Sequence, residues 1–390
     1  MDTKELLSRG VSEVYIKKEV EALLGKKGSL RIYYGVDPSG PKIHLGHAVH
    51  LRKLSILQKL GHKIIFLIGD FTGMIGDPTD RGAVRQPLTR KEVLENAKTY
   101  KKQVSRFLSF SGKNPAEIRF NSEWNDKLNF KDLIELSSHF TVQQLLERDM
   151  FQKRIKDEKP ISLHEFLYPV VQGYDAVMLD ADIQMGGTDQ TFNMLQGRTL
   201  MKSLKNKTQS VISLKLLEGS DGRKMSKSFN NVINIEDDPN DIYGKAMSIK
   251  DELIFQYFEL ATEIPMKKIG DMEKAIKKGE NPRNVKALLA FELVKMYYDE
   301  KSAKKAEEEF NKVFRDKQNP EDIKEIKLKN HMTIQEAIFA SQYISSKSEI
   351  RRLFSQNAIK VNEKTENNQD LLVVKNDIIK VGKRRWLKIV

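Results

Sequence analysis

The stretch from residue 29 to residue 70 decides the fold, and it reads SLRIYYGVDPSGPKIHLGHAVHLRKLSILQKLGHKIIFLIGD. Residues 29–36 are typical of a β-strand, and residues 45–60 carry apolar side chains along one stripe, which indicates an amphipathic helix. Residues 63–68 are a second strand candidate that ends at Gly69-Asp70. A strand, a helix and a strand in this order form a βαβ unit, so we expect a parallel β-sheet.

Outward from this unit the chain changes character several times. A charged, mostly helical stretch covers residues 89–166, and further strand candidates lie at 183–190 and 211–217. A polar-faced helical region follows at 241–317, and a charged, proline-containing connector at 319–330. We therefore expect an α/β domain with a helical insertion, then an α-helical domain. The last sixty residues predict a small α+β domain with helices at 334–340 and 348–356 and short strands at 359–361 and 378–381.

The composition limits the class of protein. Lysine and arginine number 67 and aspartate and glutamate 54, which gives a net charge of +13. This surplus favours a polyanionic partner such as nucleic acid, although a solvated lysine-rich surface explains it equally well. Cysteine is absent, which rules out disulfides and thiolate metal sites and fits the cytoplasm. No apolar run is long enough for a membrane span and no export signal is visible, so we expect a cytoplasmic protein without a membrane partner.

The first chemical motif follows the first strand. Residues 34–40 predict a sharp turn, and His44, Gly46 and His47 stand at the start of the following helix. The free N–H groups of a helix N-terminus suit phosphate, and Gly46 lets a base or ribose approach the backbone. Two histidines three residues apart can face one ligand and donate to phosphoryl oxygens. They could instead bind a metal, for which no third ligand is visible, or be incidental.

The second motif is Lys224-Met225-Ser226-Lys227-Ser228, after a polar, glycine-rich loop at 218–223. Two lysines in such a loop can close over a triphosphate and meet the charge that develops on departing pyrophosphate. The chain has no Gly-x-Gly-x-x-Gly after its first strand and no Walker loop, so dinucleotide and P-loop sites are disfavoured.

Together these motifs resemble a known family. His44-Leu45-Gly46-His47 resembles the HIGH signature of class I aminoacyl-tRNA synthetases, and residues 224–228 are their KMSKS signature. Nearly the whole chain resembles bacterial-type tyrosyl-tRNA synthetases. The matching segments are 33–37, 69–78, 121–124, 168–175 and 186–190.

The resemblance implies a domain plan. Residues 1–232 would form a Rossmann-like catalytic domain with a helical insertion at about 89–166. Residues 233–325 would form an α-helical domain on the anticodon side of tRNA, and residues 331–390 an S4-like RNA-binding domain. The insertion around 130–159 lies where the family forms a two-fold homodimer.

The resemblance also implies a tyrosine site. Asp175 would accept the phenol hydrogen and Tyr33 would supply the second contact to the hydroxyl. Gln190 would border the pocket. The substrate ammonium would be held by Asp77, Tyr168 and Gln172.

For ATP, the resemblance assigns nucleotide binding to Asp37, Gly46, Asp189, Met225 and Lys227. It assigns catalysis to His44, His47, Lys224, Lys227, Arg81 and Arg85. Asp189 would hold the ribose hydroxyls, and Arg81 and Arg85 the pyrophosphate. Asp80 departs from a family position that is often small, and an acid there could tune the affinity for ATP. Mg²⁺ would arrive with ATP, with no tightly bound metal in the protein. The expected reaction joins L-tyrosine to tRNA(Tyr) through tyrosyl-adenylate.

The tail is expected to bind tRNA. Residues 331–390 hold eleven Lys/Arg and six Asp/Glu, so their net charge is 11 − 6 = +5. Trp386 is predicted to be available for stacking on a base. The phosphate contacts are predicted at Lys347, Arg351, Arg352, Lys383, Arg384 and Arg385.

Three other classes share some of these features. A tryptophanyl enzyme has the same sheet and both signatures but lacks the S4-like tail. A nucleotidyltransferase that adenylates a small phosphorylated acceptor uses a similar histidine helix. A non-enzymatic RNA-binding protein could retain the fold of a synthetase.

Overall fold

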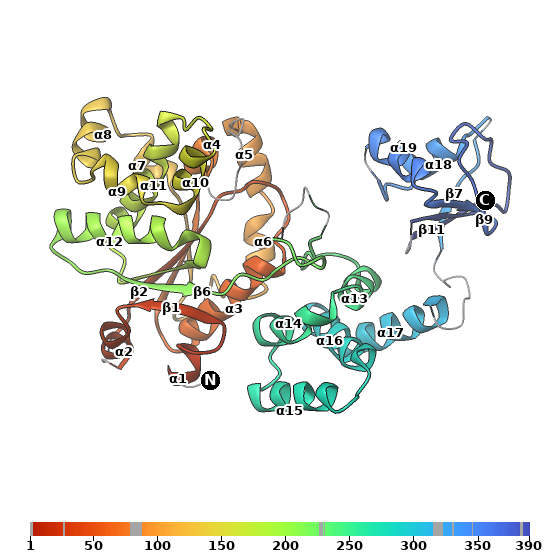
Figure 1. The fold of residues 1–390 in the computed structure, drawn as a ribbon, viewed down its shortest axis with the longest axis horizontal. Coiled ribbons are helices and arrows are strands. Elements are labelled where there is room, and N and C mark those ends of the chain that lie inside the picture. Colours follow the sequence, from red (N-terminus) through yellow and green to blue (C-terminus); the bar gives the residue numbers. More distant parts are fainter. Residues whose placement is uncertain are drawn as a thin grey trace. The chain divides into compact units, whose positions relative to one another are not determined.

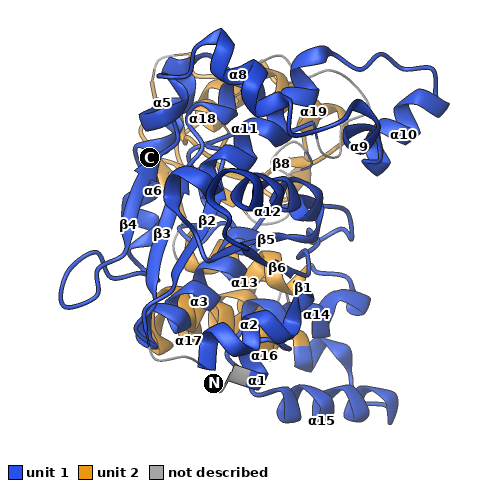
Figure 2. Cartoon of the chain, turned by 90° about the vertical axis from the view of Figure 1, so that its left-hand side faces the viewer, with its two compact units in different colours: residues 1–237, 249–285 blue, residues 238–248, 286–390 orange. Residues whose placement is uncertain are grey.

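The computed structural model describes residues 3–25, 28–78, 88–225, 229, 231–314, 323–329, 331–344, 346–382 and 385–390. The chain divides into two compact units, coloured separately in Figure 2. The first comprises residues 1–237 and 249–285, and the second residues 238–248 and 286–390. The domain bounds that we expected from the sequence remain predictions.

The first unit is built on a six-stranded sheet in the order β1-β6-β5-β2-β3-β4, which can be followed in Figure 2, while Figure 1 places the unit in the fold. All neighbouring strands are parallel except β1, which runs antiparallel to β6 along one edge. The strands are β1 Val11–Tyr15, β2 Arg31–Val36, β3 Lys63–Ile68, β4 Glu117–Phe120, β5 Ile183–Gly187 and β6 Ser210–Leu214. The predicted βαβ unit is confirmed as β2, helix α3 (Leu45–Lys59) and β3, with β2 and β3 paired from Arg31–Lys63 to Val36–Ile68.

Helices cover both faces of this sheet, as the fully buried strands β5 and β6 require. Successive residues of a strand point to opposite faces. Accordingly Tyr33 packs among residues of α11 (Leu163–Leu179) and α12 (Thr191–Lys205), while Tyr34 stacks on His50 of α3. Gly173 and Gly197 let α11 and α12 approach closely, since a Cβ on Gly173 would lie 3.1 Å from the backbone of Gln196.

The predicted helical stretch at 89–166 consists of short helices joined by turns, with one strand among them. It contains α5 Arg90–Ala97, α6 Tyr100–Val104, α7 Ser122–Asn125, α8 Phe130–Ser137, α9 Val142–Leu146 and α10 Asp149–Lys156. The strand β4, which interrupts them, pairs with β3 and was not predicted. The remaining helices of the first unit are α1 Thr3–Leu6, α2 Lys17–Gly25, α4 Thr72–Ile75, α14 Ile254–Ala261 and α15 Met266–Lys277.

The second unit contains part of the predicted helical region, together with the tail. Its helices include α13 Pro239–Met247 and α17 Glu300–Phe314, while α16 Pro282–Tyr297 begins in the first unit. The tail has its own hydrophobic core, to which α18 (Ile334–Ala340) and α19 (Lys347–Ser355) contribute. Its sheet has the order β7-β11-β10-β8-β9. These strands are β7 Lys324–Ile326, β8 Ile359–Val361, β9 Lys364–Thr365, β10 Ile378–Val381 and β11 Arg385–Ile389, and β7 lies upstream of the predicted boundary at 331.

Within the described ranges, no helix combines the length and the apolar character that a membrane crossing needs.

Candidate active site

One pocket of about 290 Å³ lies at the carboxyl ends of the parallel strands. It is reached by Asp37 after β2, Gly69 after β3, and Asp189 and Gln190 in a 3₁₀ turn after β5. In open α/β sheets ligands bind at this edge. The pocket brings together every described residue that was predicted for ATP or tyrosine: Tyr33, Asp37, His44, Gly46, His47, Asp77, Tyr168, Gln172, Asp175, Asp189, Gln190, Lys224 and Met225. The predicted Arg81, Arg85 and Lys227, and the neighbouring Asp80, lie outside the described residues.

The two signature histidines are held by the first turn of α3. His44 is the N-cap residue, and its Nδ1 accepts a hydrogen bond from the backbone N–H of Gly46 at 3.1 Å. Nδ1 of His47 accepts from the N–H of His44 at 3.4 Å, and the ring centroids lie 3.9 Å apart. A neutral imidazole that accepts at Nδ1 carries its proton at Nε2. In the neutral form each ring therefore carries its proton on Nε2.

Main-chain hydrogen bonds join the two signature regions. The N–H of Leu45 donates to the carbonyl of Ile233 at 2.9 Å, and the N–H of Ile235 donates to the carbonyl of Ile43 at 3.1 Å. A Cβ on Gly46 would lie 3.8 Å from the Sδ of Met225. The first signature and the segment that carries the second are thus adjacent, and both line the pocket.

The loop before the second signature is ordered by polar contacts. Asp221 accepts from Asn231 Nδ2 at 2.7 Å and from the N–H of Arg223 at 3.0 Å, and these contacts lower the pKa of Asp221 to about 2. Asn231 also donates to the carbonyl of Lys224 at 3.1 Å. Lys224 Nζ in turn donates to Asp189 Oδ2 at 2.7 Å. The predicted phosphate-binding lysine and the predicted ribose-binding carboxylate are therefore an ion pair.

At the deep end of the pocket, Asp175 is buried and surrounded by donors. Its Oδ1 accepts from Trp124 Nε1 at 2.8 Å and from Asn125 Nδ2 at 3.4 Å, and its Oδ2 from Asn121 Nδ2 at 3.2 Å. Burial raises the pKa of Asp175 to about 7, against the opposing effect of these three donors. The environment thus places the carboxyl near the midpoint of its titration at neutral pH.

Tyr33 faces the same end of the pocket. Its side chain is 1% exposed and its hydroxyl makes no hydrogen bond of normal geometry with the described residues. Burial, and next the charge of Asp175, raise the pKa of Tyr33 well above its usual value against a lowering contact with Gln209, so the hydroxyl stays a neutral donor. A buried hydroxyl without a well-aligned hydrogen bond is costly, and a polar ligand group there would lower the cost.

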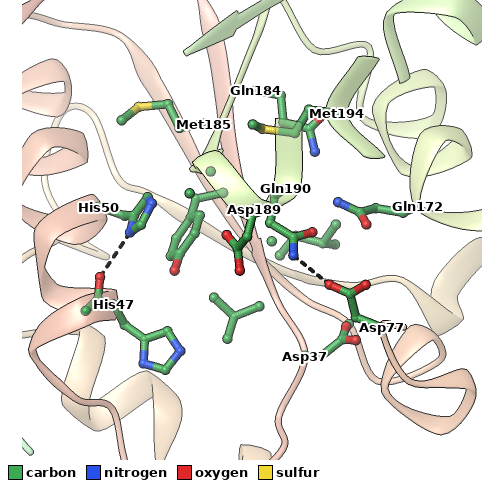
Figure 3. A pocket seen from close by; sticks show the side chains of 18 of the residues that line it. Asp37, His47, His50, Asp77, Gln172, Gln184, Met185, Asp189, Gln190 and Met194 are labelled. Atoms are coloured by element: carbon green, nitrogen blue, oxygen red, sulfur yellow. Dashed lines mark hydrogen bonds between the residues drawn. The ribbon is translucent and has the colours of Figure 1, made fainter. Parts of the chain in front are cut away.

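Carboxylates crowd the middle of the pocket, where Figure 3 shows Asp37, Asp77 and Asp189 around one space. Asp37 accepts from the hydroxyl of Tyr168 at 2.9 Å and from that of Thr72 at 2.6 Å. Burial, then the charges of Asp37 and Asp77, raise the pKa of Tyr168 well above its usual value, so Tyr168 remains a neutral donor. This concentration of negative charge suits a cationic group.

Gln190 and Asp77 face each other across this space, where Gln190 Nε2 donates to Asp77 Oδ2 at 2.6 Å (Figure 3). The other carboxylate oxygen of Asp77 accepts from Arg148 at 3.0 Å. Both neighbours therefore restrict the orientation of the Asp77 carboxylate.

The comparisons with known proteins agree with this geometry. The family model described as tRNA synthetases class I (W and Y) matches residues 25–315. The chain belongs to this family. A tyrosine–tRNA ligase of Carboxydothermus hydrogenoformans is 45% identical over 99% of this chain and 97% of its own length. Tyrosine–tRNA ligase 2 of Clostridium acetobutylicum is likewise 45% identical, over 99% of this chain and 97% of its own. The resemblance to bacterial-type tyrosyl-tRNA synthetases is thereby confirmed.

Solved structures of class I synthetases have the same fold. A C-terminally truncated mitochondrial tyrosyl-tRNA synthetase of Aspergillus nidulans gives a TM-score of 0.65 at 22% identity, over 80% of this chain and 93% of that one. The tyrosyl-tRNA synthetase of Archaeoglobus fulgidus, solved with L-tyrosine, gives 0.60 at 23% identity, over 79% of this chain and 100% of that one. The predicted α/β class with a Rossmann-like parallel sheet is confirmed.

Several residues that support the pocket of this synthetase were missed from the sequence. Asn121, Trp124 and Asn125 hold Asp175, and only the segment 121–124 was noted, without a role. Arg148 was not singled out, since it lies 71 residues from Asp77 in a run of charged residues. A signal was available for α11, because positions 168, 172 and 175 share one face of a helix.

In the tail of the synthetase, the residues predicted to contact tRNA differ in their exposure. Lys347, Arg351 and Arg352 are exposed on α19, whereas Lys383 and Arg384 lie outside the described residues. Arg385 is half-buried and donates to the carbonyl of Tyr343 at 2.6 Å, so only its other N–H groups could reach a phosphate. Trp386 is 7% exposed, and Lys380 Nζ lies 4.6 Å from its ring centroid. The prediction that this ring is available for stacking on a base is wrong, because the tail buries it.

Proposed function

We propose that this chain activates L-tyrosine with ATP, forming tyrosyl-adenylate and pyrophosphate, and transfers the tyrosyl group to the 3′-terminal ribose of tRNA(Tyr). The observation that carries the proposal is the presence of both signature regions, Tyr33 and Asp175 in one pocket. The names of relatives at 45% identity, both tyrosine–tRNA ligases, support the same substrate.

The phenol end of the substrate would meet Asp175 and Tyr33. A phenol hydroxyl donates one hydrogen bond and accepts others, so it needs one acceptor and one donor. Asp175 Oδ2, which takes one hydrogen bond from Asn121, is the acceptor in this proposal. The hydroxyl of Tyr33, which makes no hydrogen bond of normal geometry with the described residues, is the donor. Phenylalanine would leave both groups unpaired, which is how such a pocket rejects it.

The ammonium end would lie among the carboxylates. Asp77, Tyr168 and Gln172 line the middle of the pocket, and Gln190 holds Asp77 from the side. The tyrosine carboxylate would then point to the nucleotide.

The nucleotide would lie between the two signatures. Gly46 offers a bare backbone opposite Met225, and Asp189 is the proposed acceptor for the ribose hydroxyls. Asp37 borders this region and completes the nucleotide site. His44, His47 and Lys224, with Lys227, Arg81 and Arg85 beyond the described part, would contact the phosphates.

In the proposed reaction the tyrosine carboxylate attacks the α-phosphorus of ATP and pyrophosphate leaves. No side chain acts as a nucleophile, so catalysis comes from positioning and from donors aimed at the developing charge. ATP would bind as its Mg²⁺ complex, with the metal held by the phosphates.

The tRNA partner and the assembly are further parts of the proposal. The exposed cations of α19 support phosphate contacts by the tail. Phe130, Ile134 and Val142 in α8 and α9 are 78%, 57% and 63% exposed, which supports a homodimer through this insertion. A cytoplasmic location remains a prediction that fits the relatives' role in charging tRNA.

ATP–pyrophosphate exchange with the full chain tests the activity. Tyrosine should drive exchange, whereas tryptophan and phenylalanine at equal concentration should not. Exchange with tryptophan would favour the tryptophanyl alternative. Exchange with none of the three would refute the proposed activation step.

A further inference from the structure

Arg148 contacts a residue of the pocket, Asp77, from outside the set of residues that the signatures mark. It is the N-cap residue of α10, and its side chain is 5% exposed. Its Nη2 donates to Asp77 Oδ1 at 3.0 Å, while Gln190 holds Asp77 Oδ2. A buried guanidinium is costly unless charge and hydrogen bonding compensate it, so its place beside a carboxylate of the pocket needs an explanation.

Two aromatic rings fix the position of this guanidinium. Its central carbon lies 5.9 Å from the ring centroid of Phe151 and 5.7 Å from that of Phe192. Phe151 is fully buried and stacks on Phe166 of α11 at 4.7 Å, and Phe192 lies two residues after Gln190. The guanidinium thus lies near one ring of α10, which stacks on α11, and near one ring of α12, which begins directly after Gln190.

Helix α10, which begins directly after Arg148, is also held in place. Arg154, one and a half turns further along α10, pairs with Glu165 of α11 through contacts of 2.7 and 3.0 Å, and both side chains are buried. Helix α10 therefore cannot shift along α11 without breaking a buried ion pair, which is strongly destabilising. The position of Arg148 relative to α11 follows from this anchor.

We propose that Arg148 is a positioning residue that holds the Asp77 carboxylate in the orientation that binds the α-ammonium of the amino-acid substrate. This inference rests on the proposed function and goes beyond it, because it adds a residue that does not touch the substrate. A carboxylate has about four acceptor positions, so Asp77 can accept from Arg148, from Gln190 and from an ammonium together. Fixing two of these contacts beforehand lowers the ordering cost of the third.

An opposite role can be distinguished by experiment. The positive charge of Arg148 also repels an ammonium, and if repulsion were dominant its removal would strengthen substrate binding. Positioning predicts weaker binding instead, and only for ligands that carry the ammonium.

The test uses the full chain and three ligands. Tyrosine has both the ammonium and the carboxylate, tyramine has only the ammonium, and 3-(4-hydroxyphenyl)propionate has only the carboxylate. In Arg148→Gln we expect the KM for tyrosine and the Ki of tyramine to rise about 10- to 100-fold, the range for a hydrogen bond to a charged group. The Ki of 3-(4-hydroxyphenyl)propionate and the KM for ATP should change less than about threefold. Arg148→Lys should recover part of the lost affinity, because lysine keeps the positive charge but lacks the planar guanidinium that donates two parallel hydrogen bonds.

Two further variants make the result specific. Lys153→Gln removes an exposed cation from the same helix and should leave all the constants unchanged. In an Asp77→Asn background, Arg148→Gln should add little further loss, since the two residues act as a unit.

Three results would overturn the assignment. The first is that Arg148→Gln weakens the binding of tyramine and of 3-(4-hydroxyphenyl)propionate equally. The second is that Arg148→Gln binds tyramine more tightly than the wild type does. The third is that the KM and Ki values are unchanged in both Arg148 variants. If Arg148→Gln does not fold, Arg148→Lys carries the same comparison of ligands. A wild-type chain without tyrosine-dependent exchange would instead refute the proposed function, so the two failures are distinguishable.

Discussion

Lys224 and Asp189 form an ion pair, with Nζ of the lysine 2.7 Å from Oδ2 of the aspartate. The contact joins the first residue of the second signature to the proposed ribose site across 35 residues of chain. A ribose diol at Asp189 has to share the carboxylate with this lysine or displace it. Where the sugar displaces the lysine, its binding would release Lys224 toward the phosphates and so couple the two events.

This coupling makes Lys224 a target for kinetics. We expect Lys224→Gln to slow tyrosine activation by about 100-fold, because it removes a placed donor for the developing charge. The KM for tyrosine should stay within about twofold, since the lysine lies at the nucleotide end. Single-turnover measurement of adenylate formation checks both values. Lys202→Gln, an exposed lysine of α12, is the matched control. An unchanged activation rate would exclude a phosphate role for Lys224.

Asp175 predicts a pH dependence of tyrosine binding. Its pKa is raised by burial from an ordinary value of 3.8 to about 7, so the carboxyl gains a proton in the folded protein below that pH. A protonated carboxyl has lost an acceptor position for the phenol. We expect the KM for tyrosine to fall by up to tenfold per pH unit as the pH rises from about 6 to 7 and then to level off. Asp175→Asn should abolish this profile, while the KM for ATP should not follow it.

The same shift has a consequence for stability. Because the folded pKa lies above the unfolded one, Asp175 contributes stability that is fully present below the ordinary value of 3.8. That contribution is lost as the pH rises to about 7. Denaturant unfolding of the wild type and Asp175→Asn at several pH values measures it. A difference between the two proteins that does not vary with pH would contradict the raised pKa.

Trp124 should tune Asp175. Trp124→Phe removes the 2.8 Å hydrogen bond to Oδ1, which is the largest of the contacts that lower this pKa. The midpoint of the tyrosine KM profile should therefore move to higher pH. The control is Trp386→Phe, at the other tryptophan of the chain, in the tail, which should leave the midpoint in place. A midpoint that moved down in Trp124→Phe would show that the indole does not stabilise the ionised carboxylate.

Gly69 is required by a close approach. A Cβ at this position would lie 2.1 Å from Asp37 Oδ1 and 2.4 Å from the hydroxyl of Thr72, so Gly69→Ala has to displace Asp37. We expect a loss of about 1–3 kcal/mol in the free energy of unfolding. Exchange activity should also fall, because Asp37 lines the pocket. Gly270→Ala, where a Cβ meets no atom within 4 Å, should instead be neutral or stabilising by up to about 1 kcal/mol. Equal effects of the two substitutions would refute the steric argument.

Removal of the tail should separate the two half-reactions. Since β7 pairs with β11, a cut at residue 330 would leave β7 without its neighbour, and a chain of residues 1–314 is the better choice. Tyrosine-dependent exchange should persist within about threefold, because every described pocket residue lies before the cut. Charging of tRNA should fall by two orders of magnitude or more, with the loss of phosphate contacts. Undiminished charging would refute an RNA-binding role for the tail.

The parts of the fold that could be predicted are those with strong periodicity. The strand β3 was predicted at its observed bounds, and α3 within one residue, because each has a regular apolar pattern. The strands β1 and β4 were missed since they are short and only half-buried, so no alternation distinguishes them from loop. Their place in the sheet depends on partners elsewhere in the chain.

The features of the pocket also divide into those that could be predicted from the sequence and those that could not. The two signatures are recognisable because the order of their residues is specific, and Asp175 followed from the family resemblance. Contacts such as Tyr168 with Asp37 join residues 131 positions apart, and no local pattern encodes them. The burial of Trp386 was likewise invisible, since β11 was not predicted.

The main-chain ladder between residues 43–45 and 233–235 has an evolutionary consequence. Its donors and acceptors are amide groups that every residue except proline supplies, so ordinary mutation of these side chains leaves it intact. Substitutions elsewhere in the chain, including those at the pocket walls, can therefore leave the distance between the first signature and residues 233–235 unchanged. The residues that activate the amino acid can therefore be inherited unchanged while the residues that select the substrate evolve.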